Sequence, residues 1–81
     1  MQFYVYILYS EKLGRYYVGH TQNIDQRLEE HNSGQSKSTR NGNPWTLLYY
    51  LTTESRSEAV KFERKIKKRG AERFLTIDEA R

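Results

Sequence analysis

The sequence predicts an α+β protein in which a small three-stranded sheet is flanked by helices, in the order β-β-α-β-α. Runs of aromatic and β-branched residues alternate with two helix-like segments. Each helix-like segment begins with a capping sequence and has a glycine at its end. A chain of 81 residues holds one modest core, so we expect a single domain over residues 1–81.

The first two strands are expected to form a β-hairpin. Residues 3–9 are almost all aromatic or β-branched, and residues 16–19 resume this composition after a turn that contains Gly14. A third strand is expected over residues 45–51, where the same composition returns. The helices then have one or both faces of the sheet to cover.

The first helix carries both a start and a stop signal. Asn23 offers a side-chain oxygen to a helix N-terminus, Gln26 occupies the capping-box position, and Gly34 can end the helix. These signals predict a helix over residues 24–33.

The second helix has the same kind of boundaries. Ser55 and Glu58 form a second capping box, and Gly70 can terminate the helix, which predicts a helix over residues 58–69. A short helical turn is expected in the tail, around Phe74 and Leu75.

Residues 32–44 join the first helix to the third strand and are rich in Gly, Ser and Asn. This composition favours a mobile polar loop, and loops of this kind often contact ligands. Lys37 and Arg40 lie in it and are candidates for nucleic-acid binding.

Charge and cysteine content narrow the function classes. Fourteen Lys and Arg against ten Asp and Glu give a net charge of +4 and favour polyanionic partners such as DNA. No apolar run approaches the roughly 20 residues of a membrane helix, and the absence of cysteine fits a reducing compartment. We expect a soluble, cytoplasmic protein.

A run of cations in the second helix is a candidate phosphate track, with a solvated helix face as the alternative. Its members are Lys65, Lys67, Lys68 and Arg69.

One carboxylate is unusual in its position. Helical periodicity places Ala59, Phe62 and Ile66 on one apolar face of the second helix, and Glu63 lies between Ala59 and Ile66. Burial of an unpaired charge is costly, so we expect Glu63 to face a cation. That cation is expected to be either an arginine or a bound metal ion, and a structural salt bridge is the alternative to a functional role.

Arg27 and His31 lie one helical turn apart, beside the apolar side of the first helix. Arginine supplies a permanent charge and a bidentate fork for phosphate, and histidine can exchange protons near neutral pH. The alternative is an arginine paired with Glu29 or Glu30 and a solvated histidine.

Most of the seven tyrosines are expected to supply bulk to the core with their hydroxyls at the surface, although exposed ones could also stack on bases. This interpretation covers Tyr4, Tyr9, Tyr16, Tyr49 and Tyr50. Gly19 directly follows a strand-like run, which indicates a bulge or a close approach of the backbone to a ligand, or else an ordinary strand end.

Taken in order along the chain, these residues resemble the pattern of the GIY-YIG endonucleases. The resemblance rests on Tyr4-Val5-Tyr6, Tyr17-Val18-Gly19, Arg27 with His31, and Glu63. Gly19 matches the last position of the second motif. The resemblance covers nearly the whole chain and is greatest to the small stand-alone bacterial members, with a URI-type domain.

The resemblance implies an antiparallel sheet and divalent-metal-dependent hydrolysis of phosphodiester bonds, with Mg²⁺ or Mn²⁺ held by Glu63. Arg27 would steady the scissile phosphate. Tyr6 would act as general base if nearby positive charge lowered its pKa from about 10, with His31 or Tyr17 assisting.

Two departures from the pattern bear on activity. Tyr4 replaces the glycine of the first motif. Many members of the family have an asparagine after the helix that carries the glutamate, whereas this chain has no asparagine after Asn43. The compact chain also lacks the separate DNA-recognition domain of larger members. We therefore expect a monomeric, structure-directed or weakly sequence-specific DNA endonuclease, with a repair or recombination protein as its partner. A non-catalytic nucleic-acid-binding module and a protein-interaction domain are the alternatives.

Overall fold

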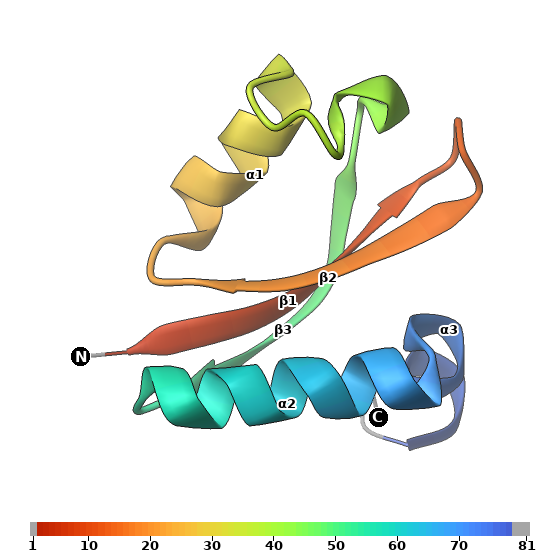
Figure 1. Cartoon of the computed structure of the whole chain (residues 1–81). Helices are drawn as coiled ribbons and strands as arrows, with labels where there is room; N and C mark the ends of the chain where they lie inside the picture. Colours follow the sequence, from red (N-terminus) through yellow and green to blue (C-terminus); the bar gives the residue numbers. More distant parts are fainter. Residues whose placement is uncertain (1, 79–81) are drawn as a thin grey trace.

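The computed structural model describes residues 2–78, with side chains described as far as Thr76. The chain forms a three-stranded sheet and two main helices in the predicted order (Figure 1). These are β1 (Phe3–Ser10), β2 (Arg15–Thr21), α1 (Ile24–Ser33), β3 (Thr46–Thr53) and α2 (Arg56–Arg69). A 3₁₀ turn, η1 (Arg40–Gly42), precedes β3, and the chain continues after α2 through α3 (Ala71–Arg73) and η2 (Phe74–Asp78).

The sheet is antiparallel, which confirms the expected α+β class. Its strand order is β2-β1-β3, so β1 is central and the other two strands are edges. Tyr6 in the middle of β1 is paired with Gly19 on one side and with Tyr50 on the other. This register places the two tyrosine-containing motifs side by side.

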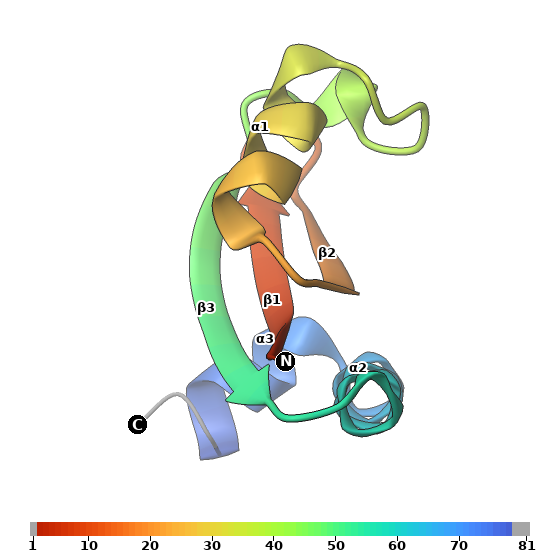
Figure 2. The same ribbon diagram turned by 90° about the vertical axis from the view of Figure 1, so that its left-hand side faces the viewer.

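Helices cover both faces of the sheet (Figures 1 and 2). Successive side chains of a strand point to opposite faces, so β1 contributes to two cores. One core lies between the sheet and α2, and consists of Val5, Ile7, Val18, Ala59, Ile66 and Phe74. The other lies on the α1 side and consists of Tyr6, Leu8 and Trp45.

The helix boundaries follow the capping signals. The Asn23 side chain accepts a hydrogen bond from the backbone N–H of Gln26 at 3.0 Å, and Gly34 ends α1 with φ of 84°. Ser55 accepts from the N–H of Glu58 at 3.2 Å. The helix α2 begins two residues before the predicted start, because the first helical residue directly follows this cap.

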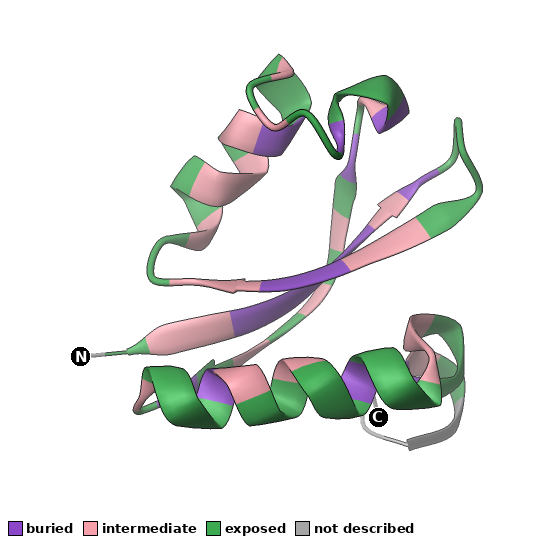
Figure 3. Ribbon diagram, viewed as in Figure 1, coloured by how far each residue is buried: buried purple, intermediate pink, exposed green. Residues whose placement is uncertain are grey.

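The prediction that Phe62 belongs to the buried face of α2 is wrong. Ala59 and Ile66 are fully buried, whereas Phe62 is 39% exposed and lies near the Lys65 ammonium. Figure 3 shows that most of α2 is exposed and that its buried positions form a narrow stripe. Residues seven apart repeat on the same side of a helix, and Phe62 falls outside that stripe.

The tail contributes more to the fold than one short turn would. The predicted helical turn is present, and Phe74 is 2% exposed and stacks edge to face on Tyr49 at 5.4 Å.

Within residues 2–78, no helix combines the length and apolarity that a membrane span requires.

Candidate active site

Three aromatic rings form a connected cluster on the α1 side of the sheet. The Tyr6 side chain is 2% exposed, and its hydroxyl lies 3.1 Å from His31 Nε2. The Tyr17 ring lies 4.8 Å from the His31 ring and 6.2 Å from the Tyr6 ring, measured between centroids. The structure thus brings together Tyr6, Tyr17 and His31 from β1, β2 and α1.

His31 is fully buried, which excludes the alternative of a solvated histidine. Its Nδ1 lies 2.7 Å from the Thr39 hydroxyl, so both ring nitrogens have partners. Burial lowers the pKa of His31 below its usual value of 6.5, and the nearby Arg27 charge lowers it further. The ring is therefore neutral at neutral pH.

Hydrogen bonds fold the loop after α1 back onto the helix. Thr39 is 1% exposed, and its carbonyl accepts from Trp45 Nε1 at 2.6 Å. The Asn32 side chain bonds both the N–H and the carbonyl of Trp45, and Ser10 Oγ donates to the Gly42 carbonyl at 2.7 Å. Buried partners therefore hold the loop at Thr39, Gly42 and Trp45, whereas Lys37 lies on its exposed part.

Gly19 provides the space for the Tyr6 hydroxyl. It lies within β2, and a Cβ atom there would sit 2.7 Å from that oxygen. The close approach predicted for Gly19 is present, but it is made to the side chain of Tyr6.

Arg27 places a permanent positive charge beside the cluster. Its Nη1 donates to Glu30 Oε1 at 2.8 Å, so the pairing that was the alternative for Arg27 occurs, with Glu30 as the partner. The guanidinium also interacts with the hydroxyls of Tyr6 and Tyr17. The bond to Glu30 and these two contacts raise the pKa of Arg27. Its charge is available to a phosphate next to the tyrosines.

Tyr6 does not have the lowered pKa that the phenol would need to act as a general base by itself. Burial raises the pKa of Tyr6 to about 12, and the Arg27 charge offsets only part of this effect. The sequence shows the nearby cation that could lower this pKa, but it does not show the extent of burial. A proton can leave this hydroxyl only with help from its partner, and that partner is His31 Nε2.

Glu63 lies on the other face of the sheet, where α2 passes the edge strand β2. His20 Nδ1 donates to its Oε1 at 2.5 Å, and Lys67 Nζ donates to its Oε2 at 2.7 Å. Burial raises the pKa of Glu63, but the hydrogen bonds from His20 and Lys67 outweigh burial, and the net pKa is lowered. Glu63 is ionised at neutral pH. It faces a cation, but that cation is the Lys67 ammonium and not the expected arginine.

The donor set around Glu63 fits a hard, water-rich cation. Among the described residues, no group of three His, Cys, Asp or Glu side chains gathers in one place. Mg²⁺ is often held by one or two carboxylates, with water and substrate phosphates as its other ligands. Lys67 would have to release Oε2, and its side chain is 55% exposed, so this ion pair is weak.

A hollow lies at the edge of the sheet, between β2 and the end of α2. It has a volume of about 350 Å³, and both Tyr17 and Lys67 line it. In Figure 1 the edge strand β2 runs between α1 and α2, which carry Arg27 and Glu63 respectively. A phosphate bound at this edge would have the tyrosine cluster on one side and the carboxylate on the other.

The predicted nucleic-acid-binding cations are all exposed, but they do not form one group. Lys37 and Arg40 lie in the loop beside α1, on the far side of the sheet from α2. Four others lie on the last turns of α2, namely Lys65, Lys67, Lys68 and Arg69. Of these four, Lys67 contacts Glu63 directly.

Sequence reasoning missed His20 and Thr39 as parts of the site. His20 had a detectable signal, since period-two alternation from Val18 places it on the α2 face of β2. Thr39 had none, because its contact with His31 depends on the path of a loop.

Comparisons with known proteins agree with this arrangement. A family model described as the GIY-YIG catalytic domain matches residues 2–74. The UPF0213 protein BH0048 of Halalkalibacterium halodurans is 38% identical over 68 residues, which are 83% of this chain and 71% of the relative. The UPF0213 protein SH2523 of Staphylococcus haemolyticus is 35% identical over 79 residues, which are 96% of this chain and 95% of the relative.

A solved structure also has this fold. The solution NMR structure of the UPF0213 protein BH0048 from Bacillus halodurans matches with a TM-score of 0.59 at 33% sequence identity. The match covers 96% of this chain and 86% of that chain.

Proposed function

Since the chain belongs to the GIY-YIG catalytic domain family, which is a nuclease family, we propose that it is a divalent-metal-dependent endonuclease that hydrolyses DNA phosphodiester bonds. The observation that carries the proposal is the contact of Tyr6 on the central strand with His31, beside the Arg27 charge. The neighbouring edge strand β2 has Glu63 on its other face, in contact with His20. Phosphodiester hydrolysis requires a base, a permanent cation and charge stabilisation, and these residues offer all three.

Arg27 is proposed to bind the scissile phosphate. Its charge is permanent and its planar fork suits two phosphate oxygens. The bond to Glu30 at 2.8 Å holds the guanidinium in place, and the guanidinium also interacts with Tyr6 and Tyr17.

Tyr6 and His31 are proposed to act together as the general base toward a water nucleophile. The Tyr6 hydroxyl is protonated near neutral pH, because burial raises its pKa to about 12. His31 is neutral and in contact with that hydroxyl, so its Nε2 can take the phenol proton while the phenol oxygen takes one from water.

Glu63 is the residue proposed to hold Mg²⁺ or Mn²⁺, with His20 fixing the orientation of its carboxylate. Such an ion supplies positive charge that offsets the negative charge developing on the leaving oxygen.

We propose a monomer in the cytoplasm that acts on DNA structures arising in repair or recombination, together with a protein of those pathways. The cysteine-free composition and the net charge of +4 support a reducing compartment and a polyanionic substrate.

A non-catalytic nucleic-acid-binding module is the second candidate, and two observations favour it. Both carboxylate oxygens of Glu63 are engaged by protein groups, and the pKa of Tyr6 is raised rather than lowered. Such a module would bind DNA in a salt-dependent manner without metal and would cleave none of it.

The test is cleavage of a panel of labelled DNAs that includes single-stranded, duplex, nicked, flapped and branched forms. Wild-type protein is compared with Glu63→Gln in Mg²⁺, in Mn²⁺ and in EDTA. Metal-dependent cuts that the variant does not make support the endonuclease. Equal trace amounts of cleaved DNA with both proteins, or binding without cleavage of any DNA form, support the binding module instead.

A further inference from the structure

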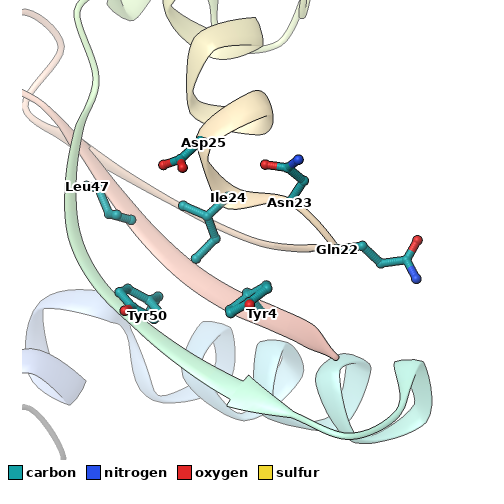
Figure 4. A pocket seen from close by; sticks show the side chains of 7 residues that line it. All are labelled: Tyr4, Gln22, Asn23, Ile24, Asp25, Leu47 and Tyr50. Atoms are coloured by element: carbon teal, nitrogen blue, oxygen red, sulfur yellow. The ribbon is translucent and has the colours of Figure 1, made fainter. Parts of the chain in front are cut away.

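A hollow that the proposed chemistry does not use lies between the first turn of α1 and the sheet (Figure 4). It has a volume of about 410 Å³. We call it the tyrosine slot, and its lining includes Tyr4, Tyr50, Ile24, Leu47, Asn23 and Asp25. In Figure 4 the rings of Tyr4 and Tyr50 lie below Ile24, which projects toward them from the start of α1.

The floor of the tyrosine slot is aromatic and accessible. Tyr50 is 53% exposed, the largest exposed fraction among the large hydrophobic residues of the described chain. Its ring meets the Tyr4 ring edge to face at 6.0 Å between centroids. Exposed aromatic rings beside a nucleic-acid site are stacking platforms, because every base offers a π face.

The charge of the tyrosine slot selects the part of a nucleotide that fits it. Among the described side chains that line it, Asp25 alone is charged. A carboxylate repels phosphate, and the slot has no lysine or arginine among those side chains to offset it. A nucleobase is planar and uncharged, and its polar edge can contact side chains such as Asn23.

The tyrosine slot lies beside the proposed catalytic centre. Tyr4 precedes Tyr6 by two residues on the same face of β1, a separation of about 7 Å along the strand. Tyr50 is paired directly with Tyr6 across the sheet. A second hollow of about 240 Å³ shares Asn23 with the slot, and Arg27 lines it. A strand with a phosphate at Arg27 would therefore carry a neighbouring base to the slot.

We propose that the tyrosine slot is a subsite for one unstacked nucleobase next to the phosphate bound by Arg27. The inference rests on the proposed function, since it concerns the same DNA strand. It makes the substrate more specific, because a base within a duplex is stacked on both faces and is not free to enter. The substrate class is a strand with an unpaired nucleotide beside the cleaved bond.

The experiment compares two ligands that carry the same backbone charge. Fluorescence anisotropy in EDTA measures binding of a labelled oligothymidine and of an abasic phosphodiester chain of equal length. The wild-type protein is expected to bind the oligothymidine about fivefold to tenfold more tightly. Tyr50→Ala is expected to bring this ratio close to one.

Leu48→Ala is the matched control, because Leu48 is also exposed on β3, at 46%, but does not line the tyrosine slot. It is expected to keep the wild-type ratio. An unchanged ratio in Tyr50→Ala, or equal binding of both ligands by the wild type, would overturn the proposal.

Cleavage measured in parallel separates this proposal from the proposed function. If cleavage depends on Glu63 but the preference for oligothymidine over the abasic chain does not depend on Tyr50, the base subsite is excluded and the nuclease is supported. If the preference for oligothymidine depends on Tyr50 but no cleavage depends on Glu63, the base subsite is supported and the binding module is favoured over the nuclease.

Discussion

Gly19 lies directly opposite Tyr6 in the β1–β2 ladder, and the space left by its missing side chain is occupied by the Tyr6 hydroxyl. A Cβ atom on Gly19 would lie 2.7 Å from that oxygen and 3.1 Å from Cε1 of Tyr17. The Tyr6 ring is 2% exposed, so its displacement would disturb the contact with His31. The glycine of the second motif therefore positions the tyrosine of the first.

The substitution Gly19→Ala is expected to lower the free energy of unfolding by about 1–3 kcal/mol, as overpacking does. Cleavage is expected to slow by about tenfold to a hundredfold, because Tyr6 is displaced from His31. Urea unfolding and single-turnover cleavage provide the two measurements.

Gly14→Ala is the control for Gly19→Ala. Gly14 has a φ of 64°, and apart from its chain neighbours no atom lies within 4 Å of the position that a Cβ would take. Alanine there adds backbone strain of about 1–2 kcal/mol without displacing Tyr6. Equal cleavage rates in the two variants would contradict the positioning role of Gly19.

Thr39 is expected to fix the orientation of His31. Thr39→Val removes the hydroxyl that lies 2.7 Å from Nδ1 and leaves a buried polar atom without its partner, at a cost of about 1–3 kcal/mol. Cleavage should slow by about tenfold, and Thr39→Ser should restore it. NMR of the His31 ring nitrogens reports the tautomer directly, and an unchanged tautomer distribution in Thr39→Val would count against this role.

Acidification is expected to destabilise the fold through His31. Burial lowers its folded-state pKa below 6.5, so below pH 6.5 the unfolded chain binds a proton that the folded chain does not. The free energy of unfolding therefore falls as the pH falls from 6.5 toward the folded-state pKa.

His31→Gln should remove this pH dependence, as measured by urea unfolding at several pH values. Glu63→Gln should retain it, because the lowered pKa of Glu63 places that titration below 4.5. If the free energy of unfolding of His31→Gln still falls as the pH falls from 6.5, the effect belongs to another group.

Lys67 is expected to compete with a metal ion for Glu63. Lys67→Gln frees Oε2 and should tighten Mn²⁺ binding by about twofold to fivefold, the range of a partly exposed ion pair. Isothermal titration calorimetry measures the change. Lys68→Gln removes the same charge from the next position of α2, and an equal gain in that variant would show that the contact itself is not the cause.

Local signals were sufficient to predict most of the fold. The bounds of α1 agree with the prediction because Asn23 and Gly34 act on their own neighbours. The core was harder to predict: Phe62 lies at an apolar position by periodicity, yet it is exposed because α2 contacts the sheet along a narrow stripe. The width of that contact depends on how the helix packs, which periodicity does not report.

The site was predictable in its residue types and less so in its protonation states. The sequence indicated that Glu63 faces a cation, but not that His20 and Lys67 together occupy both of its oxygens. A lowered pKa was the condition for Tyr6 as general base, whereas burial raises that pKa to about 12. Both effects depend on groups that are distant in the chain, and only the folded structure brings them together.

The central claim is that Glu63 serves the chemistry and not DNA binding. Its most direct test measures binding and cleavage of the same DNA by Glu63→Gln and by Glu29→Gln, which removes an equal charge at an exposed position of α1. We predict that Glu63→Gln binds the DNA as the wild type does and loses metal-dependent cleavage, and that Glu29→Gln retains both. Cleavage by Glu63→Gln at the wild-type rate would contradict the account.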